Sequence, residues 1–152
     1  MLVTRFDPRL RAHAWRLLGD ADLAGDVVQQ AWTEIVRGLD ALQDDGAFAA
    51  WAYRIVSRRC ARAVRAAQQR RRLSAALAAE PEPVAGEGSD FTALRAAVRA
   101  LPPEQRAAVA LYHYEELSIA ETAVALDVPA GTVKTRLMHA RRKLRALLEG
   151  DL

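Results

Sequence analysis

The chain has 152 residues, of which 22 are Lys or Arg and 19 are Asp or Glu, so its formal net charge is only +3. This length allows one domain or two small ones, and an apolar share of 51% is enough for packed cores. No apolar run approaches the ~20 residues of a membrane span, the first residues do not resemble a secretion signal, and a lone cysteine, Cys60, cannot form an internal disulfide. We therefore expect a cytoplasmic protein that does not contact membranes.

The composition also disfavours chemistry by the protein itself. The histidines His13, His113 and His139 match no metal-ligand spacing, and no Gly-rich loop could cradle a phosphate. We expect His13 and His113 to be packing or surface residues, and Cys60 to be a small buried hydrophobe. No paired nucleophile and base is evident, so a hydrolytic or transferase enzyme is a remote alternative. We predict no catalysis, no metal, no cofactor and no small-molecule substrate.

Helix-forming residues dominate almost the whole chain, and no run alternates with a period of two. In chain order, helices are predicted over residues 8–18, 22–37, 47–72, 90–101, 103–115, 118–126 and 130–148. Ser118 and Glu121 form a capping box at the start of one of them. Residues 38–46 are polar and rich in turn formers, which indicates a loop. The fold class predicted is all-α.

Residues 73–89, LSAALAAEPEPVAGEGS, interrupt this helical pattern. Their Pro-Glu-Pro and Gly-Glu-Gly elements break helices and indicate a flexible acidic linker. We therefore predict two small helical domains, over residues 1–72 and 90–152, joined by this linker.

The modest net charge conceals strong local segregation. Residues 19–45 carry seven acids and one base, residues 46–79 carry eight arginines and no acid, and residues 128–148 carry six bases and no acid. Two basic patches favour nucleic acid as a partner. The acidic stretch is either a docking face for another protein or only a solvated surface.

A short helix, a tight turn and a long helix over residues 118–148 match a helix-turn-helix motif. The apolar residues that helical spacing directs inward are Val133, Leu137, Ala140, Leu144 and Leu147. The candidate DNA-binding residues of the long helix are Lys134, Thr135, Arg136, Met138, His139 and Arg142. The alternative is an ordinary amphipathic helix with a solvated basic face.

The helix over residues 47–72 carries a second candidate nucleic-acid site. Arg54, Arg58, Arg62 and Arg65 recur at helical spacing beside Trp51, and a basic stripe with an aromatic platform is typical of single-strand binding. Trp51 and Phe48 also fit a core position, so both interpretations of these aromatic residues stay open.

The last sixty residues resemble a known domain. The segments LPPEQR (101–106), ETA (121–123), GTVKTRL (131–137) and ARRKL (140–144) resemble the C-terminal domain of bacterial sigma factors of the sigma-70 family. The two-domain length resembles the extracytoplasmic-function (ECF) group of that family. The resemblance implies recognition of the minus-thirty-five promoter element by Lys134, Thr135, Met138 and His139.

The N-terminal half resembles the other domain of that family. The segment DVVQQAW (26–32) is similar to the helix that docks on RNA polymerase, which implies polymerase binding by Asp26, Gln29 and Gln30. Residues 48–55 and the arginines after them are similar to the helix that melts the minus-ten element. The sequence departs from the family pattern at Gly25, Gln30, Arg58 and Arg62.

The resemblance implies an ECF sigma factor that binds core RNA polymerase and directs promoter recognition, promoter opening and transcription initiation. Its partners would be core polymerase and promoter DNA, with an anti-sigma factor as a further candidate. The alternative is a sigma-like decoy that binds an anti-sigma factor without initiating transcription.

Overall fold

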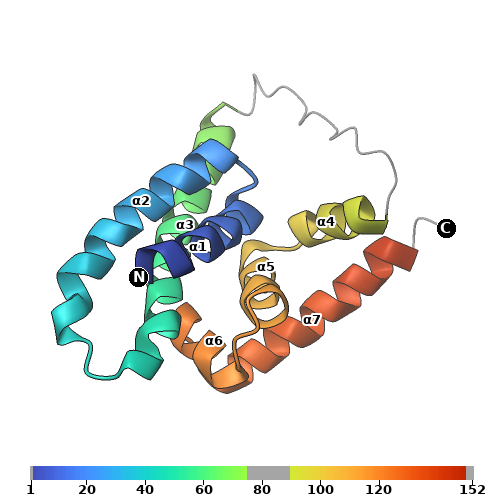
Figure 1. Ribbon diagram of the computed structural model, residues 1–152. Coiled ribbons are helices and arrows are strands. Elements are labelled where there is room, and N and C mark those ends of the chain that lie inside the picture. The colour runs from blue at the N-terminus through green and yellow to red at the C-terminus, as the bar shows by residue number, and fades with distance from the viewer. Residues whose placement is uncertain (1, 75–89, 150–152) are drawn as a thin grey trace.

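The computed structural model describes residues 2–74 and 90–149, and every regular element in these ranges is helical (Figure 1). The helices are α1 Leu2–Leu18, α2 Ala21–Gly38, α3 Phe48–Leu73, α4 Asp90–Ala100, α5 Pro103–Val109, α6 Ile119–Leu126 and α7 Ala130–Glu149. The predicted all-α fold is confirmed. We call α1–α3 the N-terminal group and α4–α7 the C-terminal group. Most of the predicted linker, residues 75–89, lies outside the described residues.

None of the helices in the described ranges is long and apolar enough to cross a membrane.

Side-chain bonds fix several helix ends at the positions that the sequence indicates. Ser118 Oγ accepts from the Glu121 backbone N–H at 3.0 Å, and Glu121 Oε1 accepts from the Ser118 N–H at 2.9 Å, which confirms the capping box. Asp20 caps α2 by accepting from two N–H groups of its first turn at 3.0 and 3.1 Å. Asp127 ends α6 in the left-handed conformation with φ 55°, which Asp tolerates better than most residues.

The first helix is longer than predicted. We expected it to begin at Pro8, yet α1 begins at Leu2 and contains that proline. A tertiary contact explains the difference, because Phe6 is buried and its ring meets the ring of Phe48 edge-on at a centroid distance of 5.0 Å. Burial of an aromatic side chain is favourable enough to hold the turn before Pro8 in helical form.

The helix predicted over residues 103–115 changes form before it ends. It is α-helical to Val109 and continues as a π-helical turn, Ala110–Tyr114. The Glu115 N–H donates to the Ala110 carbonyl at 3.0 Å and closes this wider turn. The next residues turn the chain into α6.

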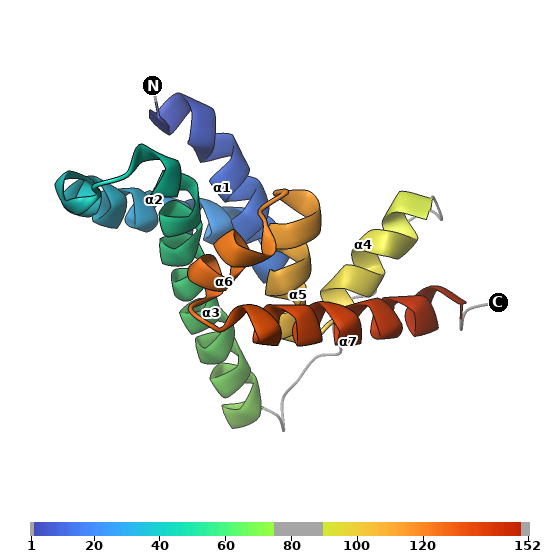
Figure 2. The same cartoon turned by 90° about the horizontal axis from the view of Figure 1, so that it is seen from below.

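Two apolar clusters hold the helices together. The first lies among α1, α2 and α3 and continues into the C-terminal group through Ala110, Leu111, Leu117 and Ala125. The second lies within the C-terminal group, beneath α7, and Leu126 of α6 touches both clusters. Helix α6 packs against α3 and α7, as Figure 2 shows. The two groups are therefore packed against one another.

A glycine allows the end of α2 to approach α3 closely. A Cβ atom at Gly38 would lie 2.7 Å from Cζ2 of Trp51, closer than real side chains pack. The indole of Trp51 is itself held in place, because it packs edge-on against Phe48 with ring centroids 6.2 Å apart. The close approach therefore requires a residue without a side chain at position 38.

We expect Gly38→Ala to destabilise the fold by ~1–3 kcal/mol, because the added methyl group displaces the Trp51 ring. Gly131 is the matched control, since a Cβ there would meet no atom within 4 Å. Gly131→Ala should be neutral or should stabilise by up to ~1 kcal/mol through helix propensity. Urea denaturation of the two variants measures both effects. A Gly38→Ala protein as stable as the wild type would contradict the close approach.

His13 is a buried packing residue, as expected from the sequence. It has no exposed surface, and its Nε2 atom shares a 2.8 Å hydrogen bond with Ser57 Oγ of α3. Its ring meets the Tyr53 ring edge-on at 5.3 Å. Burial, together with the positive charge of nearby Arg16, lowers the pKa of His13 from 6.5 to about 3. The folded protein therefore holds this imidazole neutral.

This burial makes stability depend on pH. The unfolded chain protonates His13 below pH ~6.5, whereas the folded chain does so only near pH 3, so the unfolded state binds more protons between these values. The free energy of unfolding should therefore fall as pH falls through this window, by up to ~1.4 kcal/mol per pH unit. Denaturant titrations between pH 7 and pH 5 should show a shallower slope for His13→Gln. Parallel slopes for the variant and the wild type would refute a neutral buried imidazole.

Candidate nucleic-acid interfaces

Helix α6, the turn at residues 127–129 and α7 form a helix-turn-helix in which α7 has two different faces. Val133, Leu137 and Ala140 are at most 1% exposed and pack into the second cluster, and Leu144 packs beside them. The inward face predicted from the sequence is confirmed for these residues. The exposed residues of the opposite face are Lys134, Thr135, Met138, His139 and Arg142.

The exposed face of α7 is chemically suited to a DNA groove. Within the described residues, no hydrogen bond or ion pair engages the side chains of Lys134, His139 and Arg142. Thr135 Oγ1 donates to the Gly131 carbonyl at 3.0 Å and can still accept a bond from outside. Met138 is 42% exposed, which leaves its thioether free for an apolar contact. Such a face offers donors for base edges and phosphates and an apolar group for a thymine methyl.

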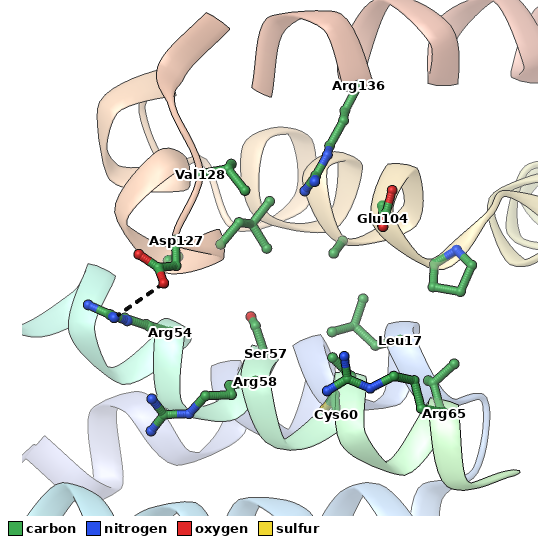
Figure 3. A pocket seen from close by; sticks show the side chains of 16 residues that line it. Leu17, Arg54, Ser57, Arg58, Cys60, Arg65, Glu104, Asp127, Val128 and Arg136 are labelled. Atoms are coloured by element: carbon green, nitrogen blue, oxygen red, sulfur yellow. Dashed lines mark ion pairs between the residues drawn. The ribbon is translucent and has the colours of Figure 1, made fainter. Parts of the chain in front are cut away.

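Arg136 does not share this exposed face. It is half-buried and lines a cavity between the two groups of helices, into which Figure 3 shows its side chain directed. Its place among the predicted DNA-binding residues therefore stays a prediction that requires Arg136 to leave this cavity.

The arginine stripe of α3 is divided between internal partners and solvent. Arg54 Nη2 lies 3.6 Å from Asp127 Oδ2 in the turn of the helix-turn-helix, and Arg58 Nη2 donates to Glu34 Oε2 of α2 at 2.5 Å. Arg62 and Arg65 are exposed, and neither forms an ion pair within the described residues. Half of the predicted strand-binding charges are thus already matched by carboxylates of this chain.

The two aromatic residues beside the stripe differ in burial. Phe48 is 5% exposed and belongs to the first cluster, which settles it as a core residue. Trp51 is half-buried and packs on the cluster from outside, so part of its indole is accessible. A base-stacking role therefore stays a prediction for Trp51 alone.

The predicted docking residues lie together on the outer face of α2. Asp26, Gln29 and Gln30 are exposed, while Val27 and Val28 on the inner face are buried in the first cluster. Gln30 Oε1 accepts a bond of 3.3 Å from Arg59 of α3. The three residues form one accessible polar surface. Contacts within the chain do not identify the partner of this surface.

A cavity of about 360 Å³ is lined by residues of α3 on one side and of α5, α6 and α7 on the other (Figure 3). Its basic residues are Arg54, Arg58, Arg65 and Arg136, and apolar side chains such as Leu17 and Val128 complete its walls. Cys60, in the middle of α3, belongs to this wall and has no exposed surface, as expected. Burial raises the pKa of the Cys60 thiol to about 12, so the thiol stays protonated and unreactive.

The sequence did not reveal one polar cluster between the groups. Glu115 is only 8% exposed and is the one buried carboxylate among the described residues. Its carboxylate accepts from Arg16 Nη1 at 2.6 Å and from the Tyr53 hydroxyl, and Arg9 Nε lies 3.6 Å away. In the sequence Glu115 stands beside Glu116, which is exposed, and no local pattern distinguishes the two.

Both halves of the chain match family models of known proteins. The model described as sigma-70 region 2 matches residues 2–71, and the model described as sigma-70, region 4 matches residues 91–144. The ECF RNA polymerase sigma factor EcfG of Rhodopseudomonas palustris is 32% identical over 95% of this chain and 81% of its own length. SigM of Mycobacterium tuberculosis is 36% identical over 92% of this chain and 70% of its own length. The ECF RNA polymerase sigma-E factor of Escherichia coli is 31% identical over 95% of this chain and 83% of its own length.

Solved structures of similar shape include two complexes with other proteins. The sigma factor RpoE from Bartonella quintana, in complex with the anti-sigma factor NepR, has a TM-score of 0.79 and 25% identity, over 99% of this chain and 96% of its own. CnrH, in complex with the cytosolic domain of CnrY, has a TM-score of 0.74 and 24% identity, over 99% of this chain and 87% of its own. At this identity, the likeness supports the fold alone.

These matches cover both groups of helices and nearly all of the chain. The chain therefore belongs to the sigma-70 family of RNA polymerase sigma factors and, within it, to the ECF group.

Proposed function

We propose that this ECF sigma factor binds core RNA polymerase in the cytoplasm and directs promoter recognition, promoter opening and transcription initiation, without catalysis of its own. The observation that carries the proposal is the division of α7 into a packed face and an exposed face of unengaged basic and polar side chains. This division stands within a chain that matches sigma regions 2 and 4.

The C-terminal group would bind the upstream, minus-thirty-five element as duplex DNA. Helix α7 would enter the major groove, where Lys134 and Arg142 donate to guanine edges or phosphates and Met138 contacts a thymine methyl. Because α7 is fixed from behind by α5 and α6, its exposed side chains hold a constant register on the duplex.

The N-terminal group would bind polymerase and the opened minus-ten strand. Asp26, Gln29 and Gln30 supply a polar docking surface on α2, and the α3 stripe supplies positive charges for phosphates. Trp51 is the candidate stacking residue, since part of its ring is accessible beside that stripe.

An anti-sigma factor is a further proposed partner. The structure of the similar sigma factor from Bartonella quintana contains the anti-sigma factor NepR. That sigma factor matches the shape of 99% of this chain. This partner is shared by the proposed function and by the alternative of a decoy, so only a transcription assay separates the two.

The decisive experiment is transcription in vitro from a genomic fragment library, with core RNA polymerase and with or without this protein. Transcripts that require the protein support the proposed function. Asp26→Lys should weaken core polymerase binding at least tenfold while helicity stays unchanged, because it reverses a charge on the exposed docking surface. Glu149→Lys, an exposed acid at the end of α7, controls for net charge. A chain that captures an anti-sigma factor but yields no transcripts would be the decoy.

The two faces of α7 predict opposite outcomes for neighbouring substitutions. Lys134→Ala and His139→Ala should leave folding unchanged and weaken upstream-element binding, each by ~1–3 kcal/mol if it removes a base contact. Leu137→Ala should instead destabilise the fold by ~2–5 kcal/mol, since Leu137 is 1% exposed in the second cluster. Thermal melts and gel-shift titrations of the full chain measure both. Unaltered DNA binding by both exposed-face variants would refute α7 as the recognition helix.

A further inference from the structure

The cavity between the two groups of helices has the size of a small-molecule site. Its volume of about 360 Å³ lies within the range of ~300–1,000 Å³ that such sites occupy. Residues of α1, α3, α5, α6 and α7 line it, so its walls come from both halves of the chain (Figure 3). Among the described residues, the lining includes none of the docking surface on α2 and none of the exposed face of α7.

Two of the arginines in this lining have no counter-ion. Arg54 and Arg58 are each paired with a carboxylate. Arg65 and Arg136, in contrast, form no hydrogen bond or ion pair with any side chain that the structure describes. Arg136 reaches into the cavity from α7, and the Arg65 guanidinium lies along the α3 wall (Figure 3). Because Arg136 is half-buried, it has lost part of its hydration without gaining a partner, and an anion would satisfy it.

The charges around the cavity do not balance. Its lining holds four arginines and two carboxylates, which leaves a formal excess of two positive charges. Glu34, which pairs with Arg58 from outside the lining, also pairs with Arg59, so it leaves this excess unchanged. Glu104 of α5 is one of the two carboxylates in the lining, and it forms no ion pair within the described ranges. The excess favours an anionic ligand over a neutral or cationic one.

Apolar side chains complete the walls and are only partly covered. Val64 of α3, Leu126 of α6 and Val128 of the turn line the cavity, and each is half-buried. Val64 belongs to neither of the two apolar clusters. Water in this space solvates the guanidinium groups but not the apolar side chains. A molecule with both an anionic group and an apolar body matches both parts of the lining.

We propose that this cavity is a binding site for an organic anion with an apolar body, of the class of fatty or aromatic carboxylates. The carboxylate binds Arg65 and Arg136, and the apolar body lies against Val64, Leu126 and Val128. Guanidinium groups suit this role, because each can donate two parallel hydrogen bonds to one carboxylate. Neither polymerase nor promoter DNA takes part in this binding, so the site is tested separately from the proposed function.

Binding is measured on the full chain by isothermal titration calorimetry with sodium octanoate and sodium 2-naphthoate. Each probe has one carboxylate, and their apolar bodies are aliphatic and aromatic respectively. Acetate and inorganic phosphate are controls that lack the apolar body, and 1-octanol is a control that lacks the charge. We expect one molecule of probe per chain at saturation, with an affinity at least about tenfold higher than that of any control.

Matched variants locate the probe within the molecule. Arg136→Gln and Arg65→Gln each remove one unpaired cation of the lining, and each should weaken octanoate binding about tenfold. Arg142→Gln and Arg62→Gln make the same change on the same two helices, at exposed residues outside the lining. These two controls should keep the affinity within about twofold of the wild type, because exposed charges contribute little.

Glu104→Gln should change the affinity in the opposite direction. It removes a carboxylate of the lining that repels the probe, so octanoate should bind about threefold more tightly. Saturating octanoate should also raise the melting temperature of the wild type more than that of Arg136→Gln, since a ligand of the folded state stabilises it. Circular dichroism checks that all variants fold. Should Arg136→Gln not fold, the exposed Arg65 decides the outcome through Arg65→Gln.

Any one of three results overturns the site. The first is the absence of saturable binding for both octanoate and 2-naphthoate. The second is an equal affinity for acetate or phosphate, which would assign the binding to charge alone. The third is an unchanged affinity in the folded variants of the lining arginines. Tighter binding of one probe than of the other supports the site and identifies the apolar body that it prefers.

Discussion

Neither half of this chain is long enough to bury a large core by itself. The two groups of helices therefore share an apolar cluster. A helical unit of about 60 residues buries only ~60% of the surface that its unfolded chain exposes. Four residues of the C-terminal group pack into the cluster of the N-terminal group: Ala110, Leu111, Leu117 and Ala125. Once this apolar contact forms, Glu115 is enclosed and needs partners, and the cavity and the Arg54–Asp127 pair arise at the same boundary.

The sequence predicted the features that depend on neighbours along one helix. The capping box at Ser118 and the buried face of α7 at Val133 and Leu137 follow from spacings of three and four residues, and the structure has both. The burial of Glu115 and the placement of Arg136 depend on how the two groups meet, which no local spacing encodes. Docking and DNA contacts depend on molecules outside the chain, so their residues stay proposals.

Two arginines of α3, Arg54 and Arg58, form weak ion pairs with carboxylates of this chain. Exposed ion pairs such as Arg58 with Glu34 and Arg54 with Asp127 contribute about 0–1 kcal/mol each. Under the proposed function, exchanging these carboxylates for phosphates of a strand would therefore cost little. Within the described residues, Lys134, His139 and Arg142 of α7 have no such carboxylate partners, and the second cluster fixes the helix from behind.

The position of α6 between two clusters makes the contact between the two groups largely apolar. Leu126 and its neighbours bury apolar surface against α3, and apolar burial weakens on cooling, with a negative heat-capacity change on contact. The ion pairs around Glu115 do not share this dependence to the same degree. Warming from the cold therefore strengthens the apolar part of the contact, and chilling favours separation of the two groups.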